Sequence, residues 1–322
     1  MKTKLLGRTE LEVPVLGLGT AFLGREYAAI NFEPNEEFGI QAIIESLEAG
    51  CKLLDTAPLY GSLKSETIIG KALKLRPELK KGLIISTKVG QVKGHRDYSY
   101  DAVMRSVEAS QQRLGINQFE ILFVHDAMNR PMEDVMGPGG ALEALRKLQD
   151  EGIVNFVGTA ANDPDTNGPY METGEFDVAM VPDSWSLLTQ QANRHIFPAA
   201  EKHNIGIFLA TPLERGLLAT GPNPDIHYQA RHFKPEIIDN VSKIQELCRE
   251  FGISLLSVSL QWCLRHPLVS TVIPGISLPS EGVQNIEAVQ MEIPEAFWPE
   301  LEPLIVDWTA TNFIEEAKHG LD

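Results

Sequence analysis

Cysteine is scarce in this chain of 322 residues, and long hydrophobic runs are absent from it. Cys51, Cys248 and Cys263 lie far apart and form no C-x-x-C pair, so we expect buried free thiols in a reducing compartment. No run of 18 apolar residues occurs, which argues against a membrane-spanning helix, and the N-terminus lacks the apolar stretch of a signal peptide. These absences predict a cytoplasmic protein.

Basic residues are in the minority, with 28 Lys and Arg against 44 Asp and Glu and a formal charge of -16. Nucleic acid and anionic membranes require clustered Lys and Arg, so we expect neither as a partner. There is no G-x-S-x-G motif, and the histidines other than His125 form no metal-ligand pattern, so we expect no metal. A hydrophobic share of 43% is ordinary for a soluble enzyme.

Short apolar runs alternate with amphipathic segments along most of the chain. Two runs, at 53–56 and 83–87, are nearly continuous in apolar residues, as strands buried on both faces of a parallel sheet are. The predicted strands are Val15–Leu18, Lys52–Leu54, Leu83–Ser86, Phe119–Val124, Ile153–Val157, Asp177–Val181, Gly206–Ala210 and Ser270–Ile273. The predicted helices are Glu36–Ala49, Ser65–Leu75, Tyr100–Leu114, Ala141–Asp150, Pro169–Thr173, Gln190–His203, Glu236–Phe251, Leu255–Arg265 and Ser280–Ala288.

Eight strand–helix units in a chain of this length predict an α/β fold of the TIM (β/α)8 barrel type. A short hairpin of Lys4–Leu6 with Leu11–Val13 precedes the barrel, and a C-terminal extension, Trp308–Asp322, follows it. The alternative is a doubly wound open sheet, but the segment at 17–22 lacks the third glycine of G-x-G-x-x-G. Without an internal repeat or linker, residues 1–322 are expected to form one domain.

Four polar residues stand at or beyond the ends of successive predicted strands: Asp55 and Tyr60, then Lys88, then His125. In a barrel these ends converge on one mouth. A charged residue that ends an apolar run is costly to bury alone, and pairing Asp55 with Lys88 removes that cost. Taken singly, these residues fit a helix cap, a turn, a solvated charge and a structural histidine; their joint order favours catalysis.

A tyrosine with its ordinary pKa of about 10 is a poor acid or base at neutral pH, and a neighbouring ammonium lowers that value. We therefore expect Lys88 to lower the pKa of Tyr60. Tyr60 would give a proton to a carbonyl oxygen as hydride arrives, or take one from an alcohol as hydride leaves. His125 would hydrogen-bond the same oxygen and orient the substrate.

Three motifs carrying these residues, DTAPLYG (55–61), STKVG (86–90) and FVHDA (123–127), resemble the tetrad motifs of the aldo-keto reductases. The resemblance extends from the opening LGRTELEVPVLGLGT to the QNI near residue 285. It implies a barrel and the same four catalytic residues. It also implies hydride transfer to or from a nicotinamide cofactor without metal or flavin.

The His125–Asp126 pair is most similar to the aldose 1-dehydrogenase branch, which oxidises D-threo-aldose, L-fucose or L-galactose, and to the pyridoxal dehydrogenases of the same branch. The resemblance implies oxidation of an aldose at C1 to a lactone, with ionised Tyr60 as the base. One alternative is a general carbonyl reductase. Another is a regulatory nicotinamide-binding barrel with little turnover, against which the complete tetrad argues. We expect a small-molecule substrate and a monomer or weak homo-oligomer.

The same resemblance implies cofactor contacts. Trp185 would stack on the nicotinamide, unless it is a core residue. Asn162 would hold the carboxamide if the loop register shifts by one residue, and Asp183 or Ser184 would replace a glutamine that the family usually has. The other expected contacts are Thr20 and Asp55, the diphosphate-wrapping residues Thr211, Leu213 and Arg215 (unless Arg215 is a surface residue), Pro274 and Gly275, and the adenine-facing residues Gln284 and Asn285.

The cofactor choice depends on Glu281 and on the absence of Lys and Arg between Ile273 and Glu287. A carboxylate repels a 2′-phosphate and accepts a hydrogen bond from a 2′-hydroxyl, so NAD is favoured over NADP. The alternative is an ordinary acid in the first turn of a helix. Substrate choice would lie in Asp126–Gly140, Thr211–Pro235 and the C-terminal extension, where Gly221–Pro235 is either a lid or surface decoration.

Overall fold

Eight parallel strands form the wall of a barrel. The structure is a computed structural model that describes residues 1–23, 36–92, 95–226, 228, 232–308 and 313–314. The strands follow one another as β3 (Leu18–Gly19), β4 (Leu53–Asp55), β5 (Ile84–Val89), β8 (Phe119–His125), β9 (Val154–Ala160), β10 (Val178–Val181), β11 (Gly206–Ala210) and β13 (Val269–Ile273). Parallel bridges from Leu16 to Val272 and from Gly19 to Gly275 join the first strand to the last. The open doubly wound alternative is therefore excluded.

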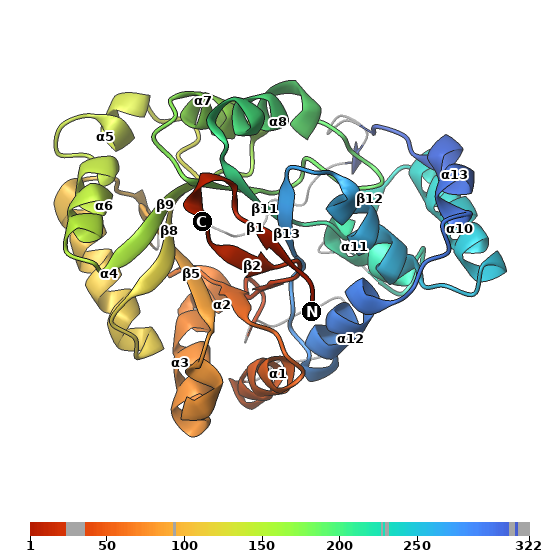
Figure 1. The fold of residues 1–322 in the computed structure, drawn as a ribbon, viewed down its shortest axis with the longest axis horizontal. Helices are drawn as coiled ribbons and strands as arrows, with labels where there is room; N and C mark the ends of the chain where they lie inside the picture. The colour runs from red at the N-terminus through yellow and green to blue at the C-terminus, as the bar shows by residue number, and fades with distance from the viewer. Residues whose placement is uncertain (24–35, 93–94, 227, 229–231, 309–312, 315–322) are drawn as a thin grey trace.

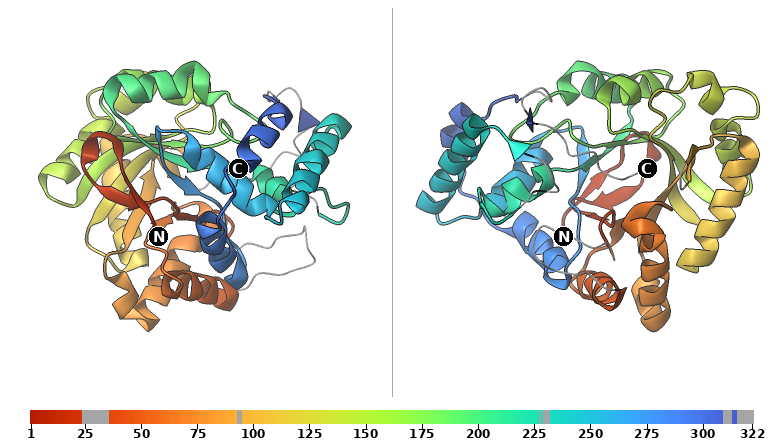
Figure 2. Two further views of the ribbon diagram at one scale, coloured as in Figure 1. Left: turned by 45° about the vertical axis from the view of Figure 1, so that its right-hand side comes forward. Right: turned by 180° about the vertical axis from the view of Figure 1, so that it is seen from behind.

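Helices surround this wall in every view (Figures 1 and 2). They are α1 (Glu36–Glu48), α3 (Ser65–Leu75), α4 (Tyr100–Leu114), α6 (Ala141–Asp150), α7 (Pro164–Glu172), α8 (Ala192–His203), α10 (Pro235–Glu250), α11 (Leu255–Arg265) and α12 (Pro279–Gln290). Four shorter ones are α2 (Tyr60–Leu63), α5 (Met132–Met136), α9 (Leu217–Thr220) and α13 (Phe297–Leu301). A second apolar cluster, beside the barrel, joins α9, α10, α11 and α13.

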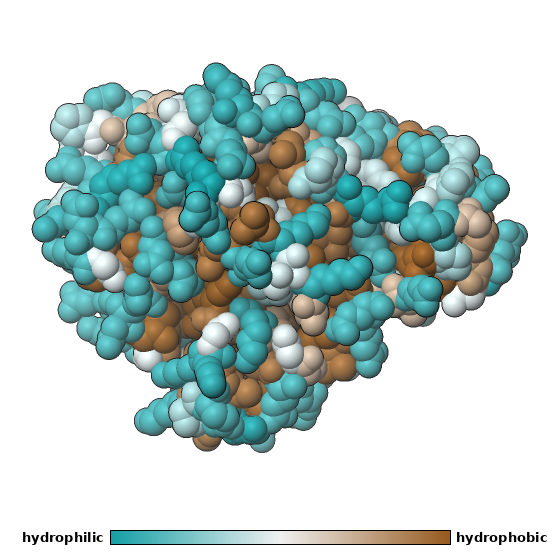
Figure 3. Space-filling view, in the orientation of Figure 1, coloured by the Kyte–Doolittle hydropathy of each residue, from teal (hydrophilic) through white to brown (hydrophobic). Residues whose placement is uncertain are grey.

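The predicted hairpin, β1 (Thr3–Leu5) with β2 (Glu12–Pro14), closes one end of the barrel. Leu6 and Val13 are fully buried in one cluster with interior side chains of the strands. The Arg8 N–H donates to the Asn204 carbonyl, just before β11 begins. The hairpin thus lies at the amino ends of the strands, and it crosses the barrel in Figure 1. On this face hydrophobic residues show between hydrophilic ones (Figure 3).

The barrel and all eight predicted strands are confirmed, with different ends. β5 continues to Val89 and β8 to His125, because the polar residues that looked like loop pair with neighbouring strands. The predicted helix Pro169–Thr173 begins earlier, at Pro164, where the Asp163 side chain accepts the Asp165 N–H as an N-cap.

Several short elements were not predicted from the sequence. They include α2, α5, the hairpin of β6 (Gln91–Val92) with β7 (His95–Arg96), and the pair of β12 (His232–Phe233) with β14 (Phe313–Ile314). The three cysteines are buried free thiols, as expected. Among the described residues, no helix is long and apolar enough to cross a membrane.

Candidate active site

The four predicted catalytic residues meet at the carboxyl end of the barrel. Asp55 ends β4, Lys88 lies one residue before the end of β5, and His125 ends β8. Tyr60 begins α2, in the loop that leaves β4. The ring of Tyr60 lies edge-to-face with that of His125, with 5.8 Å between the centroids, and Lys88 Nζ lies 4.5 Å from the Tyr60 centroid.

Asp55 and Lys88 form the predicted buried ion pair. Lys88 Nζ lies 2.6 Å from Oδ2 and 2.8 Å from Oδ1 of Asp55, and it donates to the Thr56 carbonyl at 2.9 Å. Lys88 and Asp55 are 1% and 2% exposed. The three acceptors match the three donors of an ammonium group, so the lysine is fixed rather than free to follow a ligand.

The expected effect of Lys88 on Tyr60 is wrong for this structure. Burial raises the pKa of Tyr60 well above its ordinary value, and the negative charges of Asp55 and Asp126 raise it further. The Lys88 ammonium donates its hydrogen bonds to Asp55 and to the Thr56 carbonyl. The negative charge of Asp55 also offsets the effect of the positive Lys88 charge on Tyr60. Tyr60 is therefore a protonated phenol at neutral pH, which is the form that donates a proton.

His125 is neutral over most of the pH range, because burial lowers its pKa to about 4. Its backbone carbonyl accepts the Tyr98 hydroxyl at 2.7 Å, which anchors the end of β8. Nδ1 has no hydrogen-bond partner among the described residues, and Nε2 lies 3.7 Å from Asp126 Oδ2. A neutral imidazole can donate one hydrogen bond to a substrate oxygen.

A network of hydrogen-bonded hydroxyl groups stabilises the end of β4. Thr20 Oγ1 donates to the Asp55 carbonyl at 2.9 Å and accepts from Ser65 Oγ at 2.7 Å, and Ser65 also bonds Thr56 Oγ1. Thr20 is fully buried within this hydroxyl network, so it holds Asp55 in place. Its expected cofactor contact stays a prediction.

The turn after Tyr60 is held in an unusual backbone conformation. Gly61, Ser62 and Leu63 have φ values of 58°, 56° and 71°. The Gly61 N–H donates to the Ala21 carbonyl, and a Cβ at Gly61 would lie 2.0 Å from the Leu23 carbonyl oxygen. Glycine is thus required at 61, while Leu63 adopts a conformation that costs a side-chain-bearing residue free energy.

The loop after β11 brings together the residues expected to wrap a diphosphate. Arg215 Nη2 lies 2.7 Å from Asp183 Oδ2, with both side chains 21% exposed, so Arg215 is not a freely solvated surface residue. Thr211 Oγ1 accepts the Asp183 N–H at 2.6 Å. A guanidinium, a hydroxyl and partly buried loop amides fit the chemistry of a dinucleotide diphosphate.

Trp185 does not join this group. Its ring stacks on Trp262 of α11 with centroids 4.9 Å apart, and its edges meet Phe197 of α8 and His266 at 5.0 Å each. It belongs to the apolar layer between strands and helices. The expected nicotinamide stack is corrected here, since the ring packs in that layer as a core residue.

Around the N-terminus of α12, Glu281 is an acid of the first helical turn. Its Oε2 accepts the N–H groups of Ser277 at 2.6 Å and Leu278 at 2.8 Å. The carboxylate therefore binds the amides of the two residues that precede the helix, as an N-terminal cap. Pro274 is buried, and its carbonyl accepts the Gly19 N–H. Asn285 is also buried, whereas Gly275 and Gln284 are exposed.

Asn162 lies after β9 with its side chain exposed, and its backbone N–H donates to Asp126 Oδ1 at 3.1 Å. Trp308 bonds the loop after β10 and the helix α10: its N–H donates to the Leu188 carbonyl and its indole N–H to Asn240, at 3.4 Å. Within Gly221–Pro235, the segment expected to be a lid or surface decoration, His227 and Arg231 lie outside the described residues.

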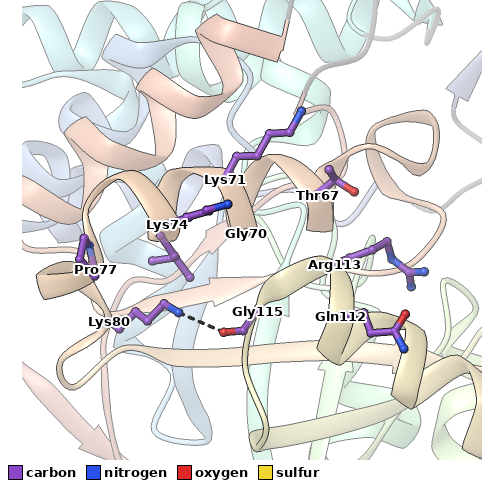
Figure 4. A pocket seen from close by; sticks show the side chains of 10 residues that line it. Thr67, Gly70, Lys71, Lys74, Pro77, Lys80, Gln112, Arg113 and Gly115 are labelled. Atoms are coloured by element: carbon purple, nitrogen blue, oxygen red, sulfur yellow. Dashed lines mark hydrogen bonds between the residues drawn. The ribbon is translucent and has the colours of Figure 1, made fainter.

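A separate groove of about 410 Å³ lies between α3 and α4, outside the barrel. Its wall carries four cations, Lys71, Lys74, Lys80 and Arg113 (Figure 4). Lys80 donates to the Gly115 carbonyl at the end of α4, so the groove extends to the helix end opposite the tetrad. Lys71 pairs with Glu36 and Arg113 with buried Glu66. The groove is not part of the tetrad site.

Sequence reasoning missed the roles of Tyr98, Ser65 and the Thr56 carbonyl, all of which hold the tetrad in place. Only the polar cluster Thr56, Ser65 and Ser86 in otherwise apolar segments signalled such a network. Among the described residues, no three His, Cys, Asp or Glu side chains gather as a metal site would require.

Comparison with known proteins agrees with this geometry. The sequence pattern of the Aldo/keto reductase family matches residues 15–305. The chain is 29% identical to pyridoxal 4-dehydrogenase of Microbacterium luteolum, over 92% of this chain and 96% of that protein. It is 28% identical to D-threo-aldose 1-dehydrogenase of a Pseudomonas species, over 90% and 94%. The holo form of an aldo-keto reductase from Bacillus halodurans superimposes with a TM-score of 0.76 at 26% identity, over 96% and 97%.

Proposed function

The chain belongs to the Aldo/keto reductase family, and from that premise we propose that it is an NAD-dependent dehydrogenase that oxidises an aldose at C1 to a lactone. Members of this family are oxidoreductases that use NAD(P)H and small-molecule substrates. The observation that carries the proposal is the Tyr60 ring held between the buried Lys88–Asp55 pair and a neutral His125. The similarity to an aldose dehydrogenase supports the substrate class.

In this proposal each residue of the site has one task. The dinucleotide, when bound, supplies or accepts the hydride through its nicotinamide ring. Thr211 and Arg215 would hold the diphosphate of the dinucleotide. Tyr60 exchanges a proton with the reacting oxygen at its phenolic oxygen. His125 donates a hydrogen bond to that oxygen and orients it, and the Lys88–Asp55 pair fixes the position of the Tyr60 ring.

The rate in each direction depends on the protonation of Tyr60. Oxidation of an alcohol needs Tyr60 as a base, and its pKa is raised by burial and by Asp55. The phenolate fraction grows with pH, so oxidation accelerates into the alkaline range. The protonated phenol is the form suited to reduction, and this favours a second candidate function, a general carbonyl reductase.

NAD is proposed over NADP on charge. Glu281 keeps a carboxylate at the N-terminus of α12 and already takes the Ser277 and Leu278 amides. No Lys or Arg lies between Ile273 and Glu287 to bind a 2′-phosphate. A second negative charge at this helix end would meet repulsion without a compensating donor.

The test is a cofactor fluorescence titration with NADH and NADPH, followed by NAD reduction with a panel of sugars and by NADH oxidation with a panel of aldehydes. We expect tighter NADH binding and lactone formation from an aldose. Tyr60→Phe should abolish turnover and keep cofactor binding, while Tyr100→Phe, on the outer helix α4, should match the wild type. Turnover that survives Tyr60→Phe at neutral pH would remove the proposed mechanism.

A further inference from the structure

Asp126 occupies a strained position next to the reaction centre. It follows His125 at the end of β8 with a φ of 48°, a conformation that side-chain-bearing residues rarely adopt and that concentrates at functional sites. Its N–H donates to the Ala160 carbonyl at 2.6 Å, and its Oδ1 accepts the Asn162 N–H at 3.1 Å. The residue is 8% exposed, so these bonds keep the carboxylate inside the mouth.

The Asp126 carboxylate lies close to His125 and affects the pKa values of three residues of the tetrad. Its Oδ2 lies 3.7 Å from His125 Nε2. Its charge adds to burial in raising the pKa of Tyr60, and it opposes burial at His125 and Lys88, whose pKa values burial lowers. A single charge that reaches all three groups lies beside the position of the reacting oxygen.

The described part of the chain fills little of the hydrogen-bonding capacity of this carboxylate. An ionised carboxylate has about four acceptor positions. Among the described residues, the Asn162 N–H is its hydrogen-bond donor, and a separation of 3.7 Å from His125 is too long for a second bond. No Asp126 oxygen is among the fully buried atoms without a partner, so a ligand that excludes solvent from the mouth has to supply a donor to this carboxylate, and a hydroxyl group does so.

We propose that Asp126 determines specificity by accepting a hydrogen bond from a hydroxyl group on the carbon next to the reacting carbon. This inference rests on the proposed function, since it places the reacting oxygen between Tyr60 and His125. The substrate class is then the α-hydroxy carbonyl compounds and their vicinal diols, which include aldoses. A carbonyl compound without the neighbouring hydroxyl leaves the carboxylate buried with too few partners, and the site rejects it for that reason.

The experiment compares glyceraldehyde with propanal as substrates for reduction by NADH. For the wild type we expect kcat/KM to favour glyceraldehyde by about 10- to 100-fold, the range for a hydrogen bond to a charged group. Asp126→Ala should remove this preference by raising the KM for glyceraldehyde and by improving kcat/KM for propanal, because the carboxylate that penalises propanal is gone. Asp126→Asn keeps an oxygen for the Asn162 N–H and should fall between the two. Asp134→Asn, an exposed acid of α5 in the same loop, is the matched control.

Each other outcome has a defined meaning. A preference that survives Asp126→Ala overturns the inference. So does an equal loss with both aldehydes, accompanied by a raised KM for NADH or a lower unfolding temperature, since a structural role predicts that pattern. A wild type that reduces both aldehydes equally overturns the inference and leaves the proposed function standing. Failure to turn over any sugar or aldehyde with either cofactor overturns both.

Discussion

The guanidinium of Arg215 is held by the carboxylate of Asp183, with Nη2 2.7 Å from Oδ2, in the loop where a cofactor diphosphate is expected. The other N–H groups of this guanidinium can bind a diphosphate. A diphosphate held there would lie close to the Asp183 carboxylate, and the two negative charges would repel each other.

Asp183→Asn should tighten NADH binding by about 2- to 5-fold, because it removes a repulsion between partly exposed charges, which is small. Asparagine also suits the φ of 50° at this position, so the loop should keep its shape. Fluorescence titration gives the dissociation constant, and Asp239→Asn, an exposed acid of α10, is the control. Weaker binding in Asp183→Asn would show that the pair organises the site instead.

Lys88→Met should lower the free energy of unfolding by about 3–5 kcal/mol, because it leaves the Asp55 carboxylate buried without its partner. The double variant Asp55→Leu with Lys88→Met should recover much of that loss while turnover stays abolished. Urea unfolding measures both. A double variant that is less stable than the single one would contradict this account.

His125 should make the stability depend on pH. Its pKa is about 4 in the folded protein and about 6.5 in an unfolded chain. Its contribution is fully present above pH 6.5 and is lost as the pH falls toward 4, because the unfolded chain takes up the proton first. At low pH this linkage lowers the free energy of unfolding of the wild type by up to about 3 kcal/mol. His125→Asn has no such loss, because asparagine does not titrate. Unfolding in urea at pH 7.5 and pH 4.5 tests it, with His95→Asn in an exposed strand expected to behave like the wild type.

Leu63→Gly should stabilise the protein by about 1 kcal/mol, because glycine adopts a φ of 71° without strain. The side chain is 41% exposed, so little packing is lost. The matched control is Leu75→Gly at the end of α3, 64% exposed, where the same substitution should destabilise. A higher unfolding temperature for Leu63→Gly and a lower one for Leu75→Gly would support backbone strain at Leu63. A lower unfolding temperature for both variants would refute it.

The sequence predicted those features that depend on burial along one segment. Apolar runs such as LLD at 53–55 are buried on both faces, so they mark strands reliably, and polar residues at their ends mark the mouth. The Asp55–Lys88 pair followed because either charge alone is too costly to bury.

Features that depend on distant partners escaped prediction. Trp185 is placed by Phe197 and Trp262, and no local pattern shows that its ring packs on helices rather than faces a ligand. The sign of the Tyr60 pKa shift depends on burial and on the charges of Asp55 and Asp126, which spacing along the sequence does not reveal. β12 pairs with β14, far along the chain, and both are only two residues long.

The hairpin that closes the amino end of the barrel gives the molecule two unlike ends. A fusion partner or affinity tag joined ahead of β1 would emerge on the side away from Tyr60 and leave the mouth open. β14, in contrast, pairs with β12, within the long loop that leaves the β11 end at the catalytic side. Immobilising the enzyme through its amino end is therefore the choice that keeps substrate and cofactor access free.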